Sequence, residues 1–171
     1  WVLYAVRDQE GPPLPEQGPT RLMRVPIAGG SPQQILSSGA YLHHACSPSG
    51  LCILEEREGN MRSIFELHPL KGRGKRLFQS ELWNGNAVIM PDGKRLAFVA
   101  GGPSGRFAPR NQIRIVTLEG AVTEEITVRS ANMLTSLEAA PDGRGFFACA
   151  RMPVAGARLY YVDLAGEATL L

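Results

Sequence analysis

The residue types that could carry out catalysis are present in this chain, but not at the spacings of catalytic motifs. The segment Gly-Pro-Ser-Gly at 102–105 lacks the Gly-x-Ser-x-Gly spacing that places a serine nucleophile on a sharp strand-to-helix turn. The segment 71–76 contains glycines and lysines, but no serine or threonine follows a lysine as in a phosphate-binding loop. The sequence therefore predicts no catalytic residues and no bound cofactor for this chain.

Histidines and cysteines do not form a metal-binding pattern either. His43 and His44 are adjacent, and neighbouring residues of a strand point to opposite faces of its sheet, so they are not expected to bind one ion together. The chain has 3 cysteines, an odd number without metal-type spacing. Cys46 and Cys52 flank a turn, and a regular hairpin would place their thiols on opposite faces, so we expect no disulfide between them.

Polar and aromatic residues outside the apolar segments offer a binding surface instead. Trp83 stands close to Asn84 and Asn86, and large aromatic residues and arginines are enriched among the residues that dominate interfaces. The candidate binding residues are Trp83, Asn84, Asn86, Arg106, Arg110, His43 and Arg151. We expect them to bind a protein or a small ligand.

The elements that position these residues are short apolar strands joined by a repeated turn. Apolar segments run into a Pro-x-Gly turn and out again at Pro48, Pro91 and Pro141. Proline sets φ for the second turn position, aspartate can hydrogen-bond the backbone two residues on, and glycine adopts a conformation that other residues avoid. Each copy therefore predicts a β-hairpin.

The spacing of the hairpins predicts a repeat architecture. The prolines are 43 and 50 residues apart, which is typical of a propeller blade, and each hairpin precedes two further strands. The four-stranded units correspond to residues 1–36, 42–79, 86–128 and 135–171, and the first lacks its first strand. A β-sandwich would also need alternating strands but gives no reason for a fixed period. We expect the chain to be part of a larger protein.

The repeat resembles the TolB-type Pro-Asp β-propeller repeat, a relative of the WD-type blade. The resemblance rests on Met-Pro-Asp-Gly at 90–93, Arg-Leu-Ala-Phe-Val at 95–99 and Tyr-Val-Asp-Leu-Ala-Gly at 161–166. It covers nearly the whole chain and weakens where Ser49 replaces the aspartate. It implies an all-β fold, a propeller segment of about four four-stranded antiparallel blades.

Similar repeats occur in periplasmic TolB, in prolyl-oligopeptidase-type propellers and in sensor regions of bacterial serine/threonine kinases and regulators. The resemblance implies a non-catalytic ligand- or protein-binding module, a sensor or scaffold part of a larger bacterial protein. The alternative is the non-catalytic propeller of a prolyl-oligopeptidase-type hydrolase. A periplasmic or extracytoplasmic location is implied by the resemblance alone.

Charge, hydropathy and strand order narrow the expected partners. A net charge of +2 argues against a nucleic-acid surface, and no apolar run approaches the roughly 20 residues of a membrane span. Meander order places the long connections at 7–20, 101–111 and 151–157 on one side, where the candidate binding residues lie, and the Pro-x-Gly turns on the other. Apolar faces of the end blades are expected to pack on another copy or on missing blades.

Strand alternation also predicts the core. The side chains expected to be mostly buried between blades are Leu3, Ile64, Ile89, Leu96, Phe98, Ile113, Ile115, Phe147, Tyr160 and Val162.

Overall fold

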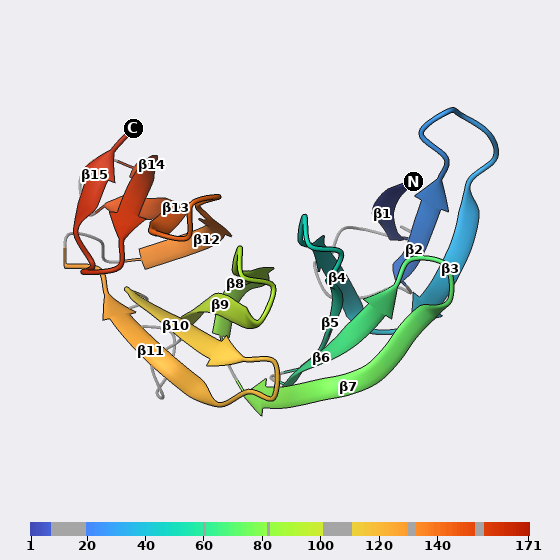
Figure 1. The fold of residues 1–171 in the computed structure, drawn as a ribbon, viewed down its shortest axis with the longest axis horizontal. Coiled ribbons are helices and arrows are strands. Elements are labelled where there is room, and N and C mark those ends of the chain that lie inside the picture. The colour runs from blue at the N-terminus through green and yellow to red at the C-terminus, as the bar shows by residue number, and fades with distance from the viewer. Residues whose placement is uncertain (8–19, 60, 82, 101–110, 130–132, 153–155) are drawn as a thin grey trace. The chain divides into compact units, whose positions relative to one another are not determined.

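The computed structural model describes residues 1–7, 20–59, 61–81, 83–100, 111–129, 133–152 and 156–171. All regular secondary structure in these ranges is β-strand, and none of them contains a helix that could cross a membrane. The strands form antiparallel sheets in which consecutive strands are neighbours (Figure 1). This confirms the all-β class and the meander order predicted from the repeat.

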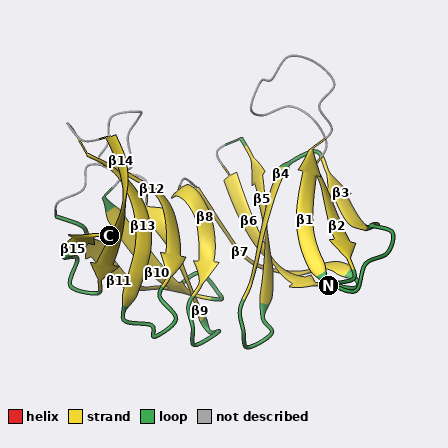
Figure 2. Ribbon diagram, turned by 90° about the horizontal axis from the view of Figure 1, so that it is seen from above, coloured by secondary structure: helices red, strands yellow, loops and turns green. Residues whose placement is uncertain are grey.

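Four sheets follow one another along the chain (Figure 2). Sheet I has three strands, β1 (Val2–Arg7), β2 (Thr20–Val25) and β3 (Gln33–Ser38). Sheet II consists of β4 (Tyr41–Cys46), β5 (Cys52–Glu58), β6 (Met61–His68) and β7 (Gly72–Glu81). Sheet III consists of β8 (Trp83–Ile89), β9 (Arg95–Ala100), β10 (Gln112–Thr117) and β11 (Val122–Thr127). Sheet IV consists of β12 (Met133–Ala139), β13 (Gly145–Met152), β14 (Gly156–Asp163) and β15 (Ala168–Leu170).

The contacts divide the chain into two compact units. The first unit contains Trp1–His44 and Leu51–Ser80, and so holds sheet I and most of sheet II. The second unit contains Ala45–Gly50 and Glu81–Leu171, and so holds sheets III and IV.

The Pro-x-Gly segments form the predicted turns. At the β8–β9 turn, the Gly93 amide donates to the Met90 carbonyl at 2.9 Å, and the Asp92 carboxylate accepts the Lys94 amide at 2.8 Å. Gly93 has a φ of 66°, a left-handed conformation that favours glycine. Asp142 accepts the amide two residues on in the same way. The repeated turn therefore sets the strand boundaries of both hairpins in the second unit.

Successive turns also pack on one another within the second unit. A Cβ atom at Gly93 would lie 2.5 Å from Ser49 Oγ, and one at Gly143 would lie 4.0 Å from Pro91 Cγ. The Ser49 hydroxyl in turn hydrogen-bonds the Ser47 hydroxyl at 2.7 Å. Glycine in these turns therefore satisfies two demands, the backbone conformation and, at Gly93, the close approach of the neighbouring turn.

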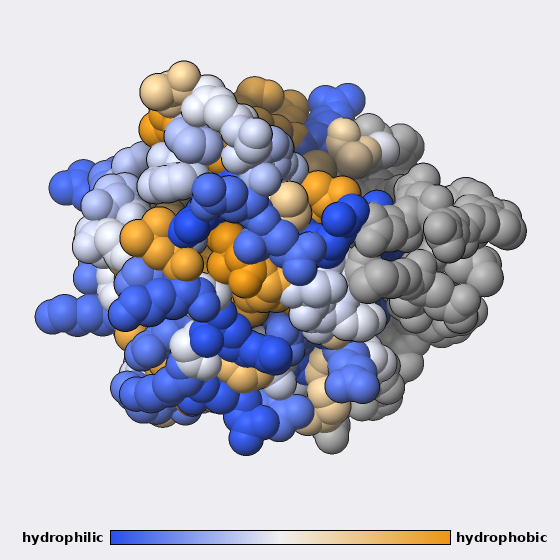
Figure 3. Space-filling model, turned by 90° about the vertical axis from the view of Figure 1, so that its right-hand side faces the viewer, coloured by the Kyte–Doolittle hydropathy of each residue, from blue (hydrophilic) through white to orange (hydrophobic). Residues whose placement is uncertain are grey.

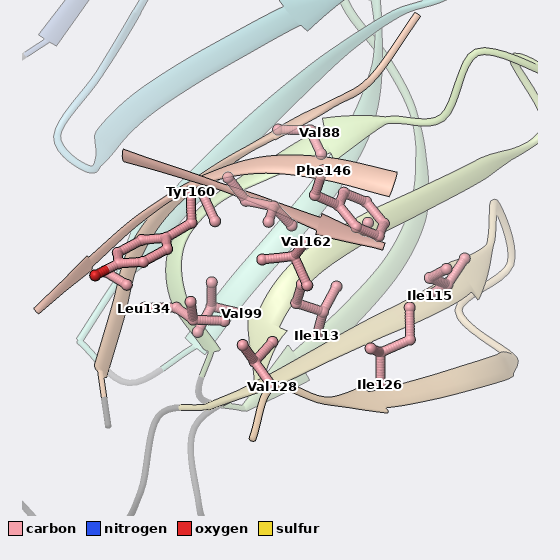
Figure 4. Packing of buried hydrophobic residues seen from close by; sticks show 14 of the residues in the cluster. Val88, Val99, Ile113, Ile115, Ile126, Val128, Leu134, Phe146, Tyr160 and Val162 are labelled. Atoms are coloured by element: carbon pink, nitrogen blue, oxygen red, sulfur yellow. The ribbon is translucent and has the colours of Figure 1, made fainter. Parts of the chain in front are cut away.

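The core of the second unit lies between the facing sides of sheets III and IV (Figure 4). Val99, Ile113 and Ile115 of sheet III belong to one buried cluster with Phe146 and Val162 of sheet IV. The first unit has its own core, made by Leu22, Leu42, Cys52, Leu54 and Leu67. Within each unit, therefore, neighbouring sheets pack their apolar faces against each other, as stacked blades require.

Most of the predicted core is confirmed. The buried members are Ile64, Leu96, Phe98, Ile113, Ile115, Tyr160 and Val162. Leu3 and Ile89 are half-buried. The prediction for Phe147 is wrong: its side chain is 38% exposed, whereas Phe146 is fully buried. Adjacent strand residues point to opposite faces, and it is Phe146, two residues before Ala148, that faces the core of sheets III and IV.

The expectation about the cysteines is also wrong. Cys46 and Cys52 are both disulfide-bonded and Cys149 is free, so the first two cysteines bond each other. β4 ends at Cys46 and β5 begins at Cys52, so the pair flanks the connecting turn. The argument for opposite faces assumed a regular ladder through that turn, whereas the bond shows that the two Cβ atoms lie within bridging distance.

Candidate functional site

Buried polar side chains gather at one end of the strands in the first unit. At this end β1 finishes at Arg7, β2 starts at Thr20, β4 starts at Tyr41, β5 finishes at Glu58 and β6 starts at Met61. We call it the loop end of the first unit, because the long connections predicted from the sequence leave the strands here. We call the polar side chains Thr20, His43, Glu55, Glu56 and Arg62 together the polar cluster. They lie on two faces of sheet II, because side chains alternate along a strand: His43, Glu55 and Arg62 are on one face, and Glu56 is on the other, which faces Thr20 of sheet I across the core of the first unit.

An ion pair is the most buried part of the cluster. Glu55 Oε1 accepts a hydrogen bond from Arg62 Nη1, and the two side chains are 0% and 7% exposed. Neighbouring strands β5 and β6 present the pair from the same side of sheet II, because Glu55 lies opposite Ile64 and Arg57 lies opposite Arg62 in the ladder. A charge this deeply buried is tolerated only when it is paired, so removing either partner would destabilise the fold.

His43 lies beside this ion pair on the inner strand of sheet II. Burial, together with the charges of the neighbouring His44 and of Arg62, lowers the pKa of His43 to about 4. His44, whose ring centroid is 6.3 Å away, also has a lowered pKa because of burial, although a hydrogen bond to the backbone of Leu3 works in the opposite direction. Both imidazoles are therefore neutral at pH 7 and suited to hydrogen bonding.

Glu56 forms the second charged pair of the cluster. Its Oε2 accepts a hydrogen bond of 2.7 Å from Arg73 Nη1, and the Arg73 guanidinium lies over the Phe65 ring, 5.2 Å from the centroid. Burial raises the pKa of Glu56, while the Arg73 charge acts to lower it. Each carboxylate of the cluster is thus matched by an arginine, and the cluster carries little net charge.

Several polar atoms of the cluster are buried but unsatisfied. Among the described residues, Thr20 Oγ1, His43 Nδ1 and Glu56 Oε1 have no hydrogen-bond partner. Such groups are uncommon in folded proteins and cost free energy, typically 1–3 kcal/mol each. The Thr20 hydroxyl and the Glu56 carboxylate oxygen lie on the facing sides of sheets I and II and together can donate to and accept from one ligand, whereas His43 lies on the opposite face of sheet II. These groups do not suit a metal ion, and the described residues contain no group of three or more histidine, cysteine or acidic side chains that could hold one.

Sequence reasoning found only His43 of this cluster. Glu55 carried a signal that was not used: it lies two residues after Ile53, on the same face of β5, where alternation calls for an apolar side chain. Arg62, at the start of the next strand, is the opposite charge that such a buried carboxylate needs. Thr20 and Glu56 carried no signal, because their burial depends on how the sheets pack.

The other predicted binding residues lie in the second unit or outside the described residues. Trp83 and Asn84 were expected in a loop, but they are the first residues of β8, where they pair with Ala100 and Val99. The preceding strand β7 continues to Glu81, so two strands replace the expected loop. The ladder between β8 and β9 is irregular between Asn84 and Val88. Residues 83–88 therefore lack the regular alternation by which a strand is recognised in a sequence.

The remaining predicted residues are not gathered into one place by the described structure. Asn86 is half-buried in β8, and Arg151 belongs to β13, where it pairs with Met133 and Ala157. Arg106 and Arg110 lie outside the described residues. Within sheet III, Trp83 and the Asp92 turn stand at opposite ends of β8, as the meander order predicts.

Comparisons with known proteins identify the fold. No family model and no curated protein matches the sequence. Among solved structures, one protein assigned as TolB, from Agrobacterium tumefaciens, matches with a TM-score of 0.61 and 21% sequence identity, over 85% of this chain and 52% of that one. The hydrazine synthase of Kuenenia stuttgartiensis matches with a TM-score of 0.57 and 17% identity, over 87% of this chain and 42% of that one.

These matches show the fold and no more. A chain of a nidogen/laminin complex matches equally well, with a TM-score of 0.58, 13% identity, and coverage of 85% of this chain and 52% of that one. The chain thus has the fold of a TolB-type β-propeller domain, and it spans about half the length of the solved structures it matches. Because one scaffold carries enzymes and binding proteins alike, function must be argued from the site.

Proposed function

We propose that the chain is a non-catalytic binding module, and that its site lies between sheets I and II at the loop end of the first unit. The proposed ligand is an uncharged molecule that carries hydroxyl or amide groups. One observation carries the proposal: Thr20 Oγ1 and Glu56 Oε1, on the facing sides of these two sheets, are buried without hydrogen-bond partners in the described part of the chain.

The cost of these unsatisfied atoms supports a binding role. A buried polar atom without a partner destabilises the protein unless a ligand satisfies it. Thr20 Oγ1 and Glu56 Oε1, on the facing sides of sheets I and II, are a pre-organised donor and acceptor, the kind of polar groups that orient a ligand in a site. The loop end is also where a propeller scaffold places its variable connections.

Charge compensation within the cluster supports an uncharged ligand. At the proposed site Arg73 neutralises Glu56, and Thr20 is uncharged. A charged ligand would enter without a counter-charge to meet it and would lose its hydration shell. A hydroxyl or amide group would instead pair with the available acceptors and donors at lower desolvation cost.

The lowered pKa of His43 supports a binding function rather than a catalytic one. A general base works best when its pKa is near the working pH, and a pKa of about 4 makes the imidazole a weak base at neutral pH. As the binding part of a longer protein, the module fits the role of a sensor or scaffold region in a larger bacterial protein, the first hypothesis from the repeat. The chain's span, about half of the matched propellers, agrees with that role.

The test is a ligand screen by saturation-transfer NMR with a library of neutral hydroxyl- and amide-bearing fragments. We expect binders whose signal is lost in Glu56→Gln, which replaces the charged carboxylate acceptor with an amide, and in Thr20→Val, which removes the hydroxyl. Glu119→Gln is the matched control, because Glu119 is an exposed carboxylate of the second unit. Fragments that bind wild type and both site variants equally would overturn the proposal, as would a library in which only charged compounds bind.

A further inference from the structure

Two neighbouring turns of the first unit lie at the end of the strands opposite to the loop end. They are the connection between β2 and β3, residues 26–32, and the connection between β6 and β7, residues 69–71. Arg24 Nη1 of β2 donates to the Pro69 carbonyl at 3.2 Å, so the two turns lie side by side (Figure 1). We call them the paired turns of the first unit.

Each of the paired turns presents a large apolar side chain to solvent. Ile27 is 80% and Leu70 54% exposed. Both lie two residues before the glycine that closes the turn, Gly29 and Gly72, so they occupy the same position of the repeat. Sheet II is preceded and followed by another sheet in the chain, so the exposure of Leu70 is a property of its turn. Figure 3 looks onto the side of the molecule that holds sheet I, where apolar side chains stand among strongly hydrophilic ones.

Positive charges surround the paired turns. Lys71, Lys75 and Arg76 are exposed, and none of them forms an ion pair in the described part of the chain. No aspartate or glutamate occurs from residue 17 to 54, and Glu66, in the neighbouring strand β6, is half-buried. The surface around the two apolar side chains is therefore strongly basic.

The corresponding turns of the second unit lack this combination. Leu118 takes the repeat position of Leu70, and it is followed by Glu119 where Leu70 is followed by Lys71. Leu164, in the same position of sheet IV, follows an aspartate directly. An exposed apolar side chain next to basic residues is thus a feature of the paired turns and not of the repeat.

The tip of the β6–β7 turn has no free backbone N–H group. Pro69 carries none, the Leu70 amide donates to His68 Nδ1 at 3.2 Å, and the Lys71 amide donates to the His68 carbonyl at 3.0 Å. The Pro69 carbonyl accepts the bond from Arg24. Backbone groups that are satisfied internally enter an apolar phase at low cost, whereas a peptide partner pairs with free ones. The tip therefore suits the interface of a lipid bilayer better than polar recognition of a protein.

We propose that the paired turns of the first unit bind the surface of an anionic lipid membrane. Ile27 and Leu70 enter the headgroup region, and Lys71, Lys75 and Arg76 contact the lipid phosphates. An interfacial anchor combines buried apolar area with electrostatic attraction to anionic lipids, and the paired turns supply both. The loop end lies at the other end of the same strands, so it stays open to solvent when the turns are on the membrane.

Co-sedimentation of the 171-residue chain with lipid vesicles tests this inference. We expect strong binding to phosphatidylcholine vesicles that contain phosphatidylglycerol, weaker binding at high salt, and little binding to phosphatidylcholine alone. Lys71→Gln and Lys75→Gln should each weaken the binding roughly fivefold, the usual effect of one basic residue near an anionic surface. Lys94→Gln is the matched control, because Lys94 is an exposed lysine of a turn in the second unit, and it should leave the binding unchanged.

The apolar side chains distinguish a membrane from an acidic protein as the partner. Ile27→Ser and Leu70→Ser should each weaken vesicle binding at least roughly fivefold, because each removes apolar area that the bilayer buries. Leu164→Ser, at the same repeat position in the second unit, is the control and should bind as wild type does. Circular dichroism of each variant verifies that the sheets are intact.

Two results would overturn the inference. One is a wild-type chain that does not bind vesicles containing phosphatidylglycerol. The other is equal vesicle binding by wild type, Ile27→Ser and Leu70→Ser, since charge alone would then hold the chain on the surface. Equally tight binding of poly-glutamate by wild type and these two variants, in that case, would identify an acidic protein as the partner.

Discussion

His43 is kept neutral in the folded chain by its burial and by the positive charge of Arg62. In the unfolded chain its pKa returns to about 6.5, so between pH 6.5 and 4 the unfolded state binds a proton that the folded state does not. The free energy of unfolding contributed by His43 therefore falls as the pH is lowered through this window and is constant above it. Urea melts between pH 7.5 and 4 should show a smaller loss for His43→Gln than for wild type.

Exposed His68 supplies the control for that pH series. His68 lies at the end of β6, and its Nδ1 accepts the Leu70 amide at 3.2 Å. His68→Gln makes the same change of residue type at an exposed position, so the effect specific to His43 is the difference between the two variants. Equal curves for wild type and His43→Gln would show that His43 is not buried as described.

The Thr20 hydroxyl should contribute to ligand binding but not to the stability of the fold. Its hydroxyl is buried and, among the described residues, unsatisfied, so Thr20→Val keeps the shape and removes the desolvation cost. We expect this variant to be more stable than wild type by about 1 kcal/mol in urea melts, while losing the fragment binding described above. A clear loss of stability would mean that the hydroxyl is already used within the fold.

The Cys46–Cys52 disulfide closes a short hairpin and limits the unfolded chain there. On the loop-entropy scale, a bond across so short a segment contributes about 2 kcal/mol. Cys46→Ser should lose about that much in thermal melts, whereas Cys149→Ser, which removes the free cysteine, should not. Equal stabilities of Cys46→Ser and wild type, with the wild-type bond verified by mass spectrometry, would contradict this. Such bonds persist in oxidising compartments, the environment of periplasmic and extracytoplasmic proteins.

At the scale of the elements, glycines fix how the turns meet the strands. Gly166 has a φ of 84°, and a Cβ there would collide with the Thr127 carbonyl oxygen of the neighbouring sheet in the second unit. Gly50 has a similar φ of 93°, but a Cβ there would meet nothing within 4 Å. The pair therefore separates backbone strain from steric contact.

Gly166→Ala should cost more free energy of unfolding than Gly50→Ala. Both lose the roughly 1–3 kcal/mol of a left-handed non-glycine residue, and only Gly166→Ala adds the collision with Thr127. Denaturant melts of both variants measure the difference. Equal losses would show that sheets III and IV are not as close at this turn as the structure has them.

Strand boundaries and turns of the hairpins followed from the sequence because the Pro-Asp-Gly signal is local. Side-chain register was harder: Phe146 and Phe147 are equally apolar, and only the packing of sheet IV decides which is buried. Trp83 was assigned to a connection because it lies between the predicted units 42–79 and 86–128, whereas β8 begins at Trp83 with an irregular ladder between Asn84 and Val88. Turn chemistry thus predicts where strands lie, while tertiary packing selects their faces.

At the scale of the whole molecule, the repeat predicted the fold and left most of the candidate site unpredicted. The blade period follows from residues close in sequence, such as those around Pro91 and Pro141. The polar cluster instead combines Thr20 of sheet I with His43, Glu55 and Glu56 of sheet II, and their burial depends on sheet packing within the first unit. Of these, only His43 was among the residues predicted to bind.

The central structural claim is that sheets III and IV stack through one apolar face of each. Phe146 and Phe147 test it most directly, because they are adjacent in β13 and point to opposite faces of sheet IV. Phe146 is fully buried in the core between sheets III and IV, whereas Phe147 is 38% exposed.

Urea melts of Phe146→Ala and Phe147→Ala decide. Phe146→Ala should lose about 3–5 kcal/mol of the free energy of unfolding, the usual cost of truncating a buried phenylalanine, and Phe147→Ala should lose clearly less. Equal losses, or a larger loss for Phe147→Ala, would contradict the stacking of the two sheets.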